Sequence, residues 1–259
     1  MFATQYTEAI ILNTMRGVST QAPQNLFIGL FFSSPGDTGT AGTEISYAGY
    51  QRRPITFSAP ATIGGFRTIR NTTEITFATT TVEIGVVGHL GVFDAQTGGN
   101  CVLYGQFLEA PRIEAQEAPV IGVNEASWWL TGNFGTQFAD RCLNWFRGQD
   151  LVGFSPHVAL FNGNANTGGL ELSGNTYARI PITFSEPQIQ SNGASRIQSS
   201  IDVESPRSTG PWGVWDHTNI MEQASGGIVV AIVQRFAPKQ TKAGIKIIFR
   251  AGQLAVQVN

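Results

Sequence analysis

Apolar residues recur at helical spacing near the start of the chain and again near its middle. The first set is Tyr6, Ile10, Ile11 and Met15, and the second set is Phe138, Cys142, Leu143 and Phe146. Steps of three and four residues place side chains on one face of a helix. An Arg-Gly pair follows each set, which supplies a cation for the helix C-terminus and a glycine where the helix can stop. The sequence therefore predicts two short amphipathic helices.

The rest of the chain alternates between apolar segments and polar turns. Residues 26–32 form a nearly continuous apolar run, and residues 55–58 and 182–185 both read Ile-Thr-Phe-Ser. A period of two is typical of a strand with one buried face. Short strands separated by turn signals predict a mainly β chain, built of antiparallel β-sandwich, jelly-roll-like domains that each follow a short helix. Further strands are predicted at residues 74–77, 88–93, 101–107, 128–130, 228–236 and 245–250.

The pattern recurs because the chain contains two copies of one module. Residues 50–60 and 177–187 share Tyr-x-Arg-x-Pro-Ile-Thr-Phe-Ser-x-Pro. Farther on, Gly-Val-Phe-Asp at 91–94 matches Gly-Val-Trp-Asp at 213–216, and each match precedes a Gly-Gly pair. A repeat of about 130 residues is the size of a domain, so each copy is expected to bury its own core. We place the two domains at residues 1–131 and 132–259, with the boundary in the Gly-rich stretch 130–135.

Few residues are charged. Charged residues make up 13% of the chain and the net charge is −2, whereas about a quarter of an average soluble protein is charged. Interface centres are depleted in charge, so this composition favours faces that partners cover. The first lysine is Lys239, and the preference for arginine fits either interface-rich surfaces or codon bias in a GC-rich genome. Because no basic stripe is present, we expect no nucleic-acid partner.

The apolar runs and the cysteines bear on localisation. The start, Met-Phe-Ala-Thr, lacks the features of a secretory signal, and no apolar run reaches the roughly 18 residues of a membrane span. We therefore expect synthesis in a cytoplasm and no membrane insertion. Cys101 and Cys142 do not recur between the copies, which predicts free thiols in a reducing compartment.

One pair of charged positions recurs around the longest repeat. An arginine is the third residue of each Tyr-x-Arg motif, and a glutamate precedes each motif. An arginine near a carboxylate predicts a salt bridge that pins the loop to the strand. The residues concerned are Glu44 and Arg52 in the first copy, and Glu171 and Arg179 in the second.

Other polar candidates are weaker. Asp94 and Asp216 each end a Gly-Val-aromatic-Asp segment. Such an aspartate either accepts backbone hydrogen bonds that shape the following turn, which we favour, or serves as a ligand or calcium carboxylate. The three histidines do not align between the copies, and no Gly-x-Ser-x-Gly, P-loop, Cys-x-x-Cys or His-Glu-x-x-His motif occurs. We expect no enzyme, no metal site and no cofactor. The histidines are His89, His157 and His217.

Tryptophans are the remaining candidates. Trp128 and Trp129 are adjacent, so in a strand they point to opposite faces and one of them can lie outside. Trp145 lies next to Phe146 in the second predicted helix. For each ring, packing in the core or between modules is favoured over a platform on which a sugar stacks.

Several of these segments together resemble the tail-fibre or virion structural proteins of tailed bacteriophages. The motifs are Ser-Pro-Gly-Asp-Thr-Gly-Thr at 34–40, Gly-Tyr-x-Arg-x-Pro-Ile-Thr-Phe-Ser-Ala-Pro at 49–60 and His-Leu-Gly-Val-Phe-Asp-Ala-Gln-Thr-Gly-Gly-Asn at 89–100. The resemblance covers residues 25–107 well and is thinner in the second copy. It implies a virion component made in the cytoplasm of a bacterial host, and it transfers no catalytic residues.

Two fused modules allow three chains to present six similar modules, or six chains twelve. We therefore expect a homo-oligomer of three or six chains that contacts other virion proteins in the tail, the neck or the base of a fibre. The alternatives are a capsid cement or decoration protein and a carbohydrate-binding adhesin that recognises a glycan on the host surface.

Overall fold

The computed structural model describes residues 1–130 and 133–258. Within them the chain is mainly β, and its two α-helices are α1 (Gln5–Thr14) and α2 (Thr136–Trp145). No helix in these ranges is both long and apolar enough to cross a membrane. The predicted domain boundary, between residues 131 and 132, lies outside the described residues.

Both helices end as predicted. Gly17 and Gly148 follow them with φ of 87° and 85°, a left-handed conformation that glycine adopts without a steric cost. Their N–H groups donate to the carbonyls of Thr14 and Trp145, each at 3.2 Å. Of the two predicted apolar stripes, all residues are buried except Tyr6, which is 40% exposed.

The first copy forms one five-stranded sheet and three smaller ones. The orders are β1-β9-β8-β2-β3, β12-β5-β4, β10-β7 and β11-β6. Its strands are β1 (Phe2–Ala3), β2 (Leu26–Phe31), β3 (Arg53–Ile55), β4 (Ala61–Ile63), β5 (Phe66–Arg70), β6 (Ile75–Thr76), β7 (Gly85–Val86), β8 (His89–Phe93), β9 (Cys101–Gln106), β10 (Arg112–Ile113), β11 (Val120–Ile121) and β12 (Ser127–Trp129).

The second copy repeats this plan. Its main sheet is β14-β13-β19-β20, with β15 also paired to β13, and the smaller sheets β16-β17-β22 and β18-β21 correspond to β4-β5-β12 and β6-β11. Its elements are β13 (His157–Asn162), the 3-10 helix η1 (Ala165–Thr167), β14 (Leu170–Glu171), β15 (Ile180–Pro181), β16 (Gln188–Ile189), β17 (Ser195–Gln198), β18 (Val203–Glu204), β19 (Val214–Met221), β20 (Val229–Gln240), β21 (Ile248–Phe249) and β22 (Ala255–Val258).

The two Ile-Thr-Phe-Ser segments alternate as predicted. Ile55, Phe57, Ile182 and Phe184 are buried, and the threonines between them are exposed. The segments are less regular than expected, since β3 ends at Ile55 and the phenylalanines make only isolated bridges.

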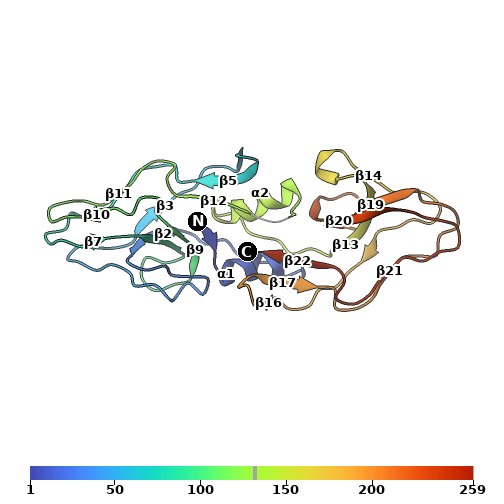
Figure 1. The fold of residues 1–259 in the computed structure, drawn as a ribbon, viewed down its shortest axis with the longest axis horizontal. Helices are drawn as coiled ribbons and strands as arrows, with labels where there is room; N and C mark the ends of the chain where they lie inside the picture. Colours follow the sequence, from blue (N-terminus) through green and yellow to red (C-terminus); the bar gives the residue numbers. More distant parts are fainter. Residues whose placement is uncertain (131–132, 259) are drawn as a thin grey trace.

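Each helix packs against strands of both copies. Helix α1 contacts β9 of its own copy and β17 and β22 of the second copy, whereas α2 contacts β20 of its own copy and β5 of the first. Figure 1 shows both helices and both chain ends near the middle of the long axis, between the two sets of sheets. The copies therefore exchange equivalent contacts, which is the geometry of a twofold-related pair.

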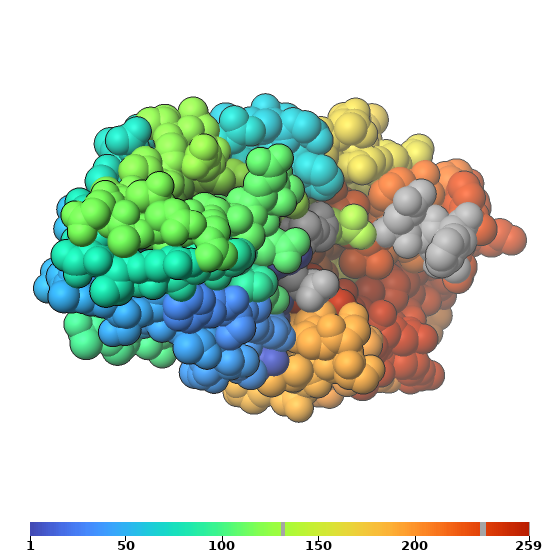
Figure 2. Space-filling view, turned by 60° about the vertical axis from the view of Figure 1, so that its left-hand side comes forward, coloured from blue at the N-terminus to red at the C-terminus, as the bar shows by residue number. Residues whose placement is uncertain are grey.

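Polar contacts tie the exchanged helices in place. Arg67 of β5 binds Asp140 of α2, with Nε to Oδ1 at 2.6 Å. On the other side, the N–H of Ser195 in β17 donates to the carboxylate of Glu8 in α1 at 3.0 Å. Figure 2 shows the second copy packed directly against the first, with the orange segments lying beside the blue ones.

One continuous core joins the copies. A single cluster of buried residues contains Ile11 and Val102 of the first copy together with Leu143 and Ile197 of the second. The expectation that each copy buries its own core is therefore wrong. The physical reason is the exchange of helices, since the apolar surface of each helix is shared between the two copies.

Candidate functional site

A tyrosine, a glutamate and an arginine form a cluster on the main sheet of the first copy. The Tyr50 hydroxyl accepts the Leu30 N–H at 2.9 Å and donates to Glu44 at 3.0 Å. Arg52 reaches the same carboxylate with Nε at 2.9 Å and Nη2 at 2.7 Å. Its Nη1 donates to the carbonyl of Gly98 at 2.7 Å. The cluster thus joins strand β2, the segment before the Tyr-x-Arg motif and the turn at 94–100.

The second copy repeats the cluster group by group. The Tyr177 hydroxyl accepts the Leu160 N–H at 3.0 Å and lies 3.2 Å from a Glu171 oxygen. Arg179 binds Glu171 through Nε and Nη2, both at 2.8 Å, and its Nη1 donates to the Gly226 carbonyl at 2.5 Å. The two predicted salt bridges are therefore present. Each also binds the tyrosine of the Tyr-x-Arg motif and a turn, and neither of these contacts was predicted from the sequence.

These clusters hold loops in place and leave few donors for a ligand. Burial raises the pKa of Tyr50 and of Tyr177 above the ordinary tyrosine value, so both stay protonated at neutral pH. The guanidinium carbon of Arg52 also lies 3.4 Å from the centroid of the Phe93 ring, a cation–π arrangement. A cleft of about 380 Å³ opens beside Glu44 and Arg52, but the arginine is already bound to the carboxylate and the turn.

Strand register corrects the alignment of the histidines. In the first copy His89 of β8 lies opposite Phe31 of β2, and in the second His217 of β19 lies opposite Phe161 of β13. Because Phe31 and Phe161 occupy the same place in the repeat, His89 and His217 are counterparts. The conclusion that no two histidines align is therefore wrong.

The same register shows that Asp94 and Asp216 are not counterparts. Asp94 corresponds to Glu222, whose carboxylate accepts a backbone N–H of the equivalent turn, and the predicted match to Asp216 is wrong. Asp94 accepts the Asn100 N–H at 2.6 Å, as expected for a turn-shaping carboxylate. Asp216 lies within β19 and accepts the Gly163 N–H at 2.7 Å. The sequence match of Gly-Val-Phe-Asp with Gly-Val-Trp-Asp therefore lies six residues away from the alignment that strand pairing gives.

Two of the tryptophans are buried in the region where the copies meet. Trp128 is 2% exposed, and its ring centroid lies 4.7 Å from that of Phe146 just after α2. Trp145 of α2 is buried and donates its indole N–H to the carbonyl of Gln21 at 3.0 Å. Both rings therefore pack between segments of the first and second copies.

Trp129 points the other way, as predicted for a neighbour in a strand. It is 37% exposed and Phe66 is 51% exposed, with ring centroids 6.3 Å apart. The corresponding positions of the second copy hold Gln257 and Ala194. An exposed aromatic pair on the sheet β12-β5-β4 is therefore a feature of the first copy.

Glu8 is a residue that the sequence analysis missed. It is completely buried in α1, and its Oε1 has no hydrogen-bond partner in the part of the chain that the structure describes. Burial raises its pKa to about 7, so the carboxyl group titrates near neutral pH. A comparison of the two copies could have drawn attention to Glu8, because the corresponding residue of α2 is Ala139.

The described residues contain no group of three or more histidine, cysteine or acidic side chains placed to hold a metal ion. Cys101 and Cys142 are buried free thiols, as predicted. Burial raises the pKa of Cys101 to about 12 and raises that of Cys142 as well, so neither thiol is a reactive thiolate at neutral pH.

Comparison with known proteins identifies the family to which the chain belongs. The model of the family described as Podophage GP4 fiber I protein gp80 matches the chain twice, over residues 2–128 and 133–257. No curated protein matches it. Each match contains one helix, one main sheet and one Tyr-Glu-Arg cluster. The chain therefore belongs to the bacteriophage tail-fibre family of the podophage GP4 fiber I protein gp80, and it carries two copies of the family's module in tandem.

Proposed function

We propose that this protein is a non-enzymatic structural component of a bacteriophage virion, located in the tail apparatus. The family match over both copies carries the proposal. The polar clusters found in both copies support it, because their side chains bind loops of the same chain. A fibre family favours the tail over a capsid cement role, which remains the alternative location.

We propose two modules, at residues 1–131 and 132–259, each an irregular antiparallel sandwich of a main sheet covered by smaller ones. The two family matches, which meet near this boundary, support the division. The buried cluster supports the sandwich, since it contains Val92 of the main sheet as well as Ile75 and Ile121 of a small one.

Assembly into a symmetric homo-oligomer of three or six chains follows as part of the proposal. Low charge and exposed apolar side chains favour faces covered by partners. Leu108 is fully exposed, and Leu170 and Val152 are 74% and 69% exposed. These residues are candidates for contacts between chains or with other virion proteins.

Immunogold electron microscopy of purified particles tests the location. Antibodies against the chain are expected to label the tail or its fibres. Label spread over the capsid faces would support the decoration role, and purified particles without any label would overturn the virion assignment.

A second candidate function, recognition of a host-surface glycan, is favoured by the exposed pair of Phe66 and Trp129. Two neighbouring exposed rings offer a surface on which a sugar ring can stack. A glycan array tests it with Trp129→Ala, and Gln257→Ala at the corresponding position of the second copy is the matched control. Binding that is lost only in Trp129→Ala supports this function. Binding that neither substitution changes places the glycan elsewhere.

A further inference from the structure

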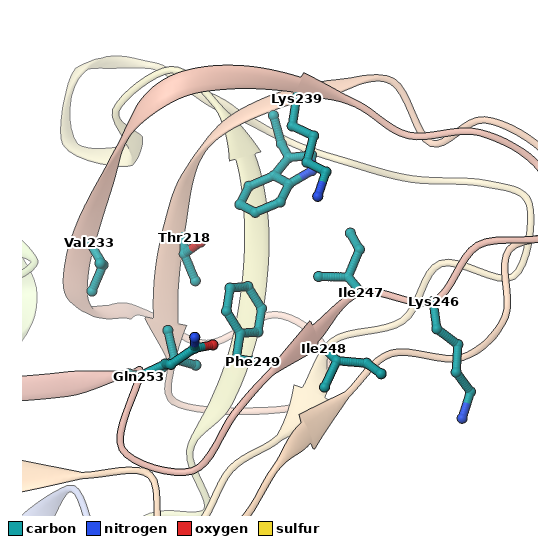
Figure 3. A pocket seen from close by; sticks show the side chains of 10 residues that line it. Thr218, Val233, Lys239, Lys246, Ile247, Ile248, Phe249 and Gln253 are labelled. Atoms are coloured by element: carbon teal, nitrogen blue, oxygen red, sulfur yellow. The ribbon is translucent and has the colours of Figure 1, made fainter.

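A cleft of about 640 Å³ lies in the second copy between the main sheet and β21. Its walls are Trp215 and Thr218 of β19, Ile247 and Phe249 around β21, and Lys239 of β20. In Figure 3 the side chains of Thr218, Ile247 and Phe249 face one common space, and the ammonium group of Lys239 points toward it. The volume is within the range of small-ligand sites.

The first copy has the corresponding cleft, but with a different lining. In the first copy the Val87 N–H donates to the Pro111 carbonyl. At the same place in the second copy Trp215 pairs with Lys239, so Trp215 corresponds to Val87 and Lys239 to Pro111. The cleft of the first copy is about 320 Å³ and includes Val87, Pro111 and Glu117. The two copies can therefore be compared directly. The cleft of the second copy is larger, and an indole and an ammonium group stand where the first copy has the side chains of Val87 and Pro111.

The charged groups at the cleft also differ between the copies. Arg112 and Glu117 line the first cleft, whereas the charged residues that line the second are Lys239 and Lys246. Ile245 occupies the place of Glu117, since both carbonyls accept an equivalent backbone N–H, from Ser208 and Thr80 respectively. Lys239 makes no ion pair with the described residues, whereas Lys246, which also lines the cleft, binds Glu204 at 2.8 Å. One basic side chain thus remains available at the cleft for an anion.

The uncharged walls combine apolar and polar groups. Phe249 is partly exposed and Gln253 is exposed at the rim. An aromatic ring packs against the C–H face of a sugar ring, and an ammonium group binds a carboxylate through a charge-assisted hydrogen bond. The oxygen of Gln253 already accepts the Arg250 N–H at 2.7 Å, so its amide nitrogen is the group that can donate to a sugar hydroxyl. The open cleft brings these three chemistries together.

We propose that this cleft binds a carboxylated sugar unit, as found in uronic acids, with its carboxylate on Lys239 and its ring against Phe249. The site goes beyond the proposed fibre role and does not rest on it. The two proposals can fail separately: the protein can belong to a fibre and bind no sugar at this cleft, or bind the sugar and lie elsewhere in the virion.

Titration of the full ¹⁵N-labelled chain, followed by NMR, tests the site with three probes: galacturonate, galactose and trigalacturonate. Galacturonate is expected to shift the amide signals of β19 and β21 and to bind about five-fold more tightly than galactose, the ratio for one exposed ion pair of about 1 kcal/mol. Tighter binding of trigalacturonate than of galacturonate would assign the site to a polysaccharide chain, and equal binding to a free sugar acid.

Lys239→Gln removes the ammonium group and is expected to abolish the preference for galacturonate over galactose. Lys242→Gln is the matched control, because Lys242 lies three residues away and does not line the cleft. Three results would overturn the proposal: no binding of galacturonate, equal binding of galacturonate and galactose, or the same loss in both lysine variants. Each leaves the location of the protein in the virion untouched.

Discussion

Thr20 and Leu151 exchange both of their backbone hydrogen bonds. The Thr20 N–H donates to the Leu151 carbonyl at 2.8 Å, and the Leu151 N–H donates to the Thr20 carbonyl at 2.9 Å. Each is the third residue after the glycine that ends a helix, Gly17 or Gly148, so the two are counterparts. A residue that pairs with its own counterpart lies on a twofold axis. The chain thus resembles a symmetric dimer whose two subunits have been fused.

If the copies are held by this internal twofold contact, the peptide link between them is not needed to keep them together. We predict that a chain cut by a protease at a site inserted between residues 130 and 133 stays in one particle. Size-exclusion chromatography under native conditions checks this. Halves that separate without denaturant would contradict the exchanged packing of α1 and α2.

Glu8 makes stability depend on pH. Its pKa is raised from 4.5 to about 7 by burial, so the folded protein holds this proton more tightly than the unfolded chain. This contribution to stability is fully present below pH 4.5 and is lost as the pH rises to about 7. We predict that Glu8→Gln raises the free energy of unfolding at pH 8 by about 1 to 3 kcal/mol.

Urea unfolding between pH 4.5 and 8 measures this effect. The stability of Glu8→Gln should fall much less over that range than the stability of the parent chain. Glu74→Gln, at an exposed position, is the control and should leave the decline unchanged. A parallel pH profile in Glu8→Gln and the parent chain would show that the Glu8 carboxyl is not responsible.

Arg52→Lys should destabilise the first copy, because an ammonium group cannot make the paired bonds to Glu44 and reach the Gly98 carbonyl as well. The arginine side chain is 11% exposed, and we expect a loss of about 1 to 3 kcal/mol in the free energy of unfolding. Arg112→Lys is the control, since this ion-paired side chain is 57% exposed and its substitution should leave the free energy of unfolding nearly unchanged. Similar losses in both variants would contradict the role given to the cluster.

Truncation of Trp128 should destabilise the protein far more than truncation of Trp129. Trp128→Ala removes a buried ring at the junction of the copies and should cost about 3 to 5 kcal/mol. Trp129→Ala removes a partly exposed ring and should cost about 1 kcal/mol or less. Thermal unfolding of the two variants measures the difference. A large loss in Trp129→Ala would mean that its ring serves stability and is not free for a ligand.

The features that the sequence predicted correctly depend on local rules. The glycines after both helices, the opposite faces of Trp128 and Trp129, and the alternation around Phe57 follow from backbone geometry over a few residues. The Arg52 and Arg179 salt bridges were predicted because the same residue types recurred in both copies.

The features that it missed depend on long-range packing. Helical spacing shows that one face of α1 is buried, but not that strands of the other copy cover it. The match of Asp94 with Asp216 failed because a short motif can recur out of register, and strand pairing alone fixes the register. Glu8 was overlooked because a charged helix residue is ordinarily exposed, and its burial arises only where α1 meets β17.

The central claim, a structural virion protein that assembles symmetrically, is tested most directly by the mass of the purified full chain in solution. Light scattering at rising concentration should give a closed species of three or six times the mass of one chain. A single-chain mass at every concentration, up to those found in a virion, would contradict the symmetric assembly.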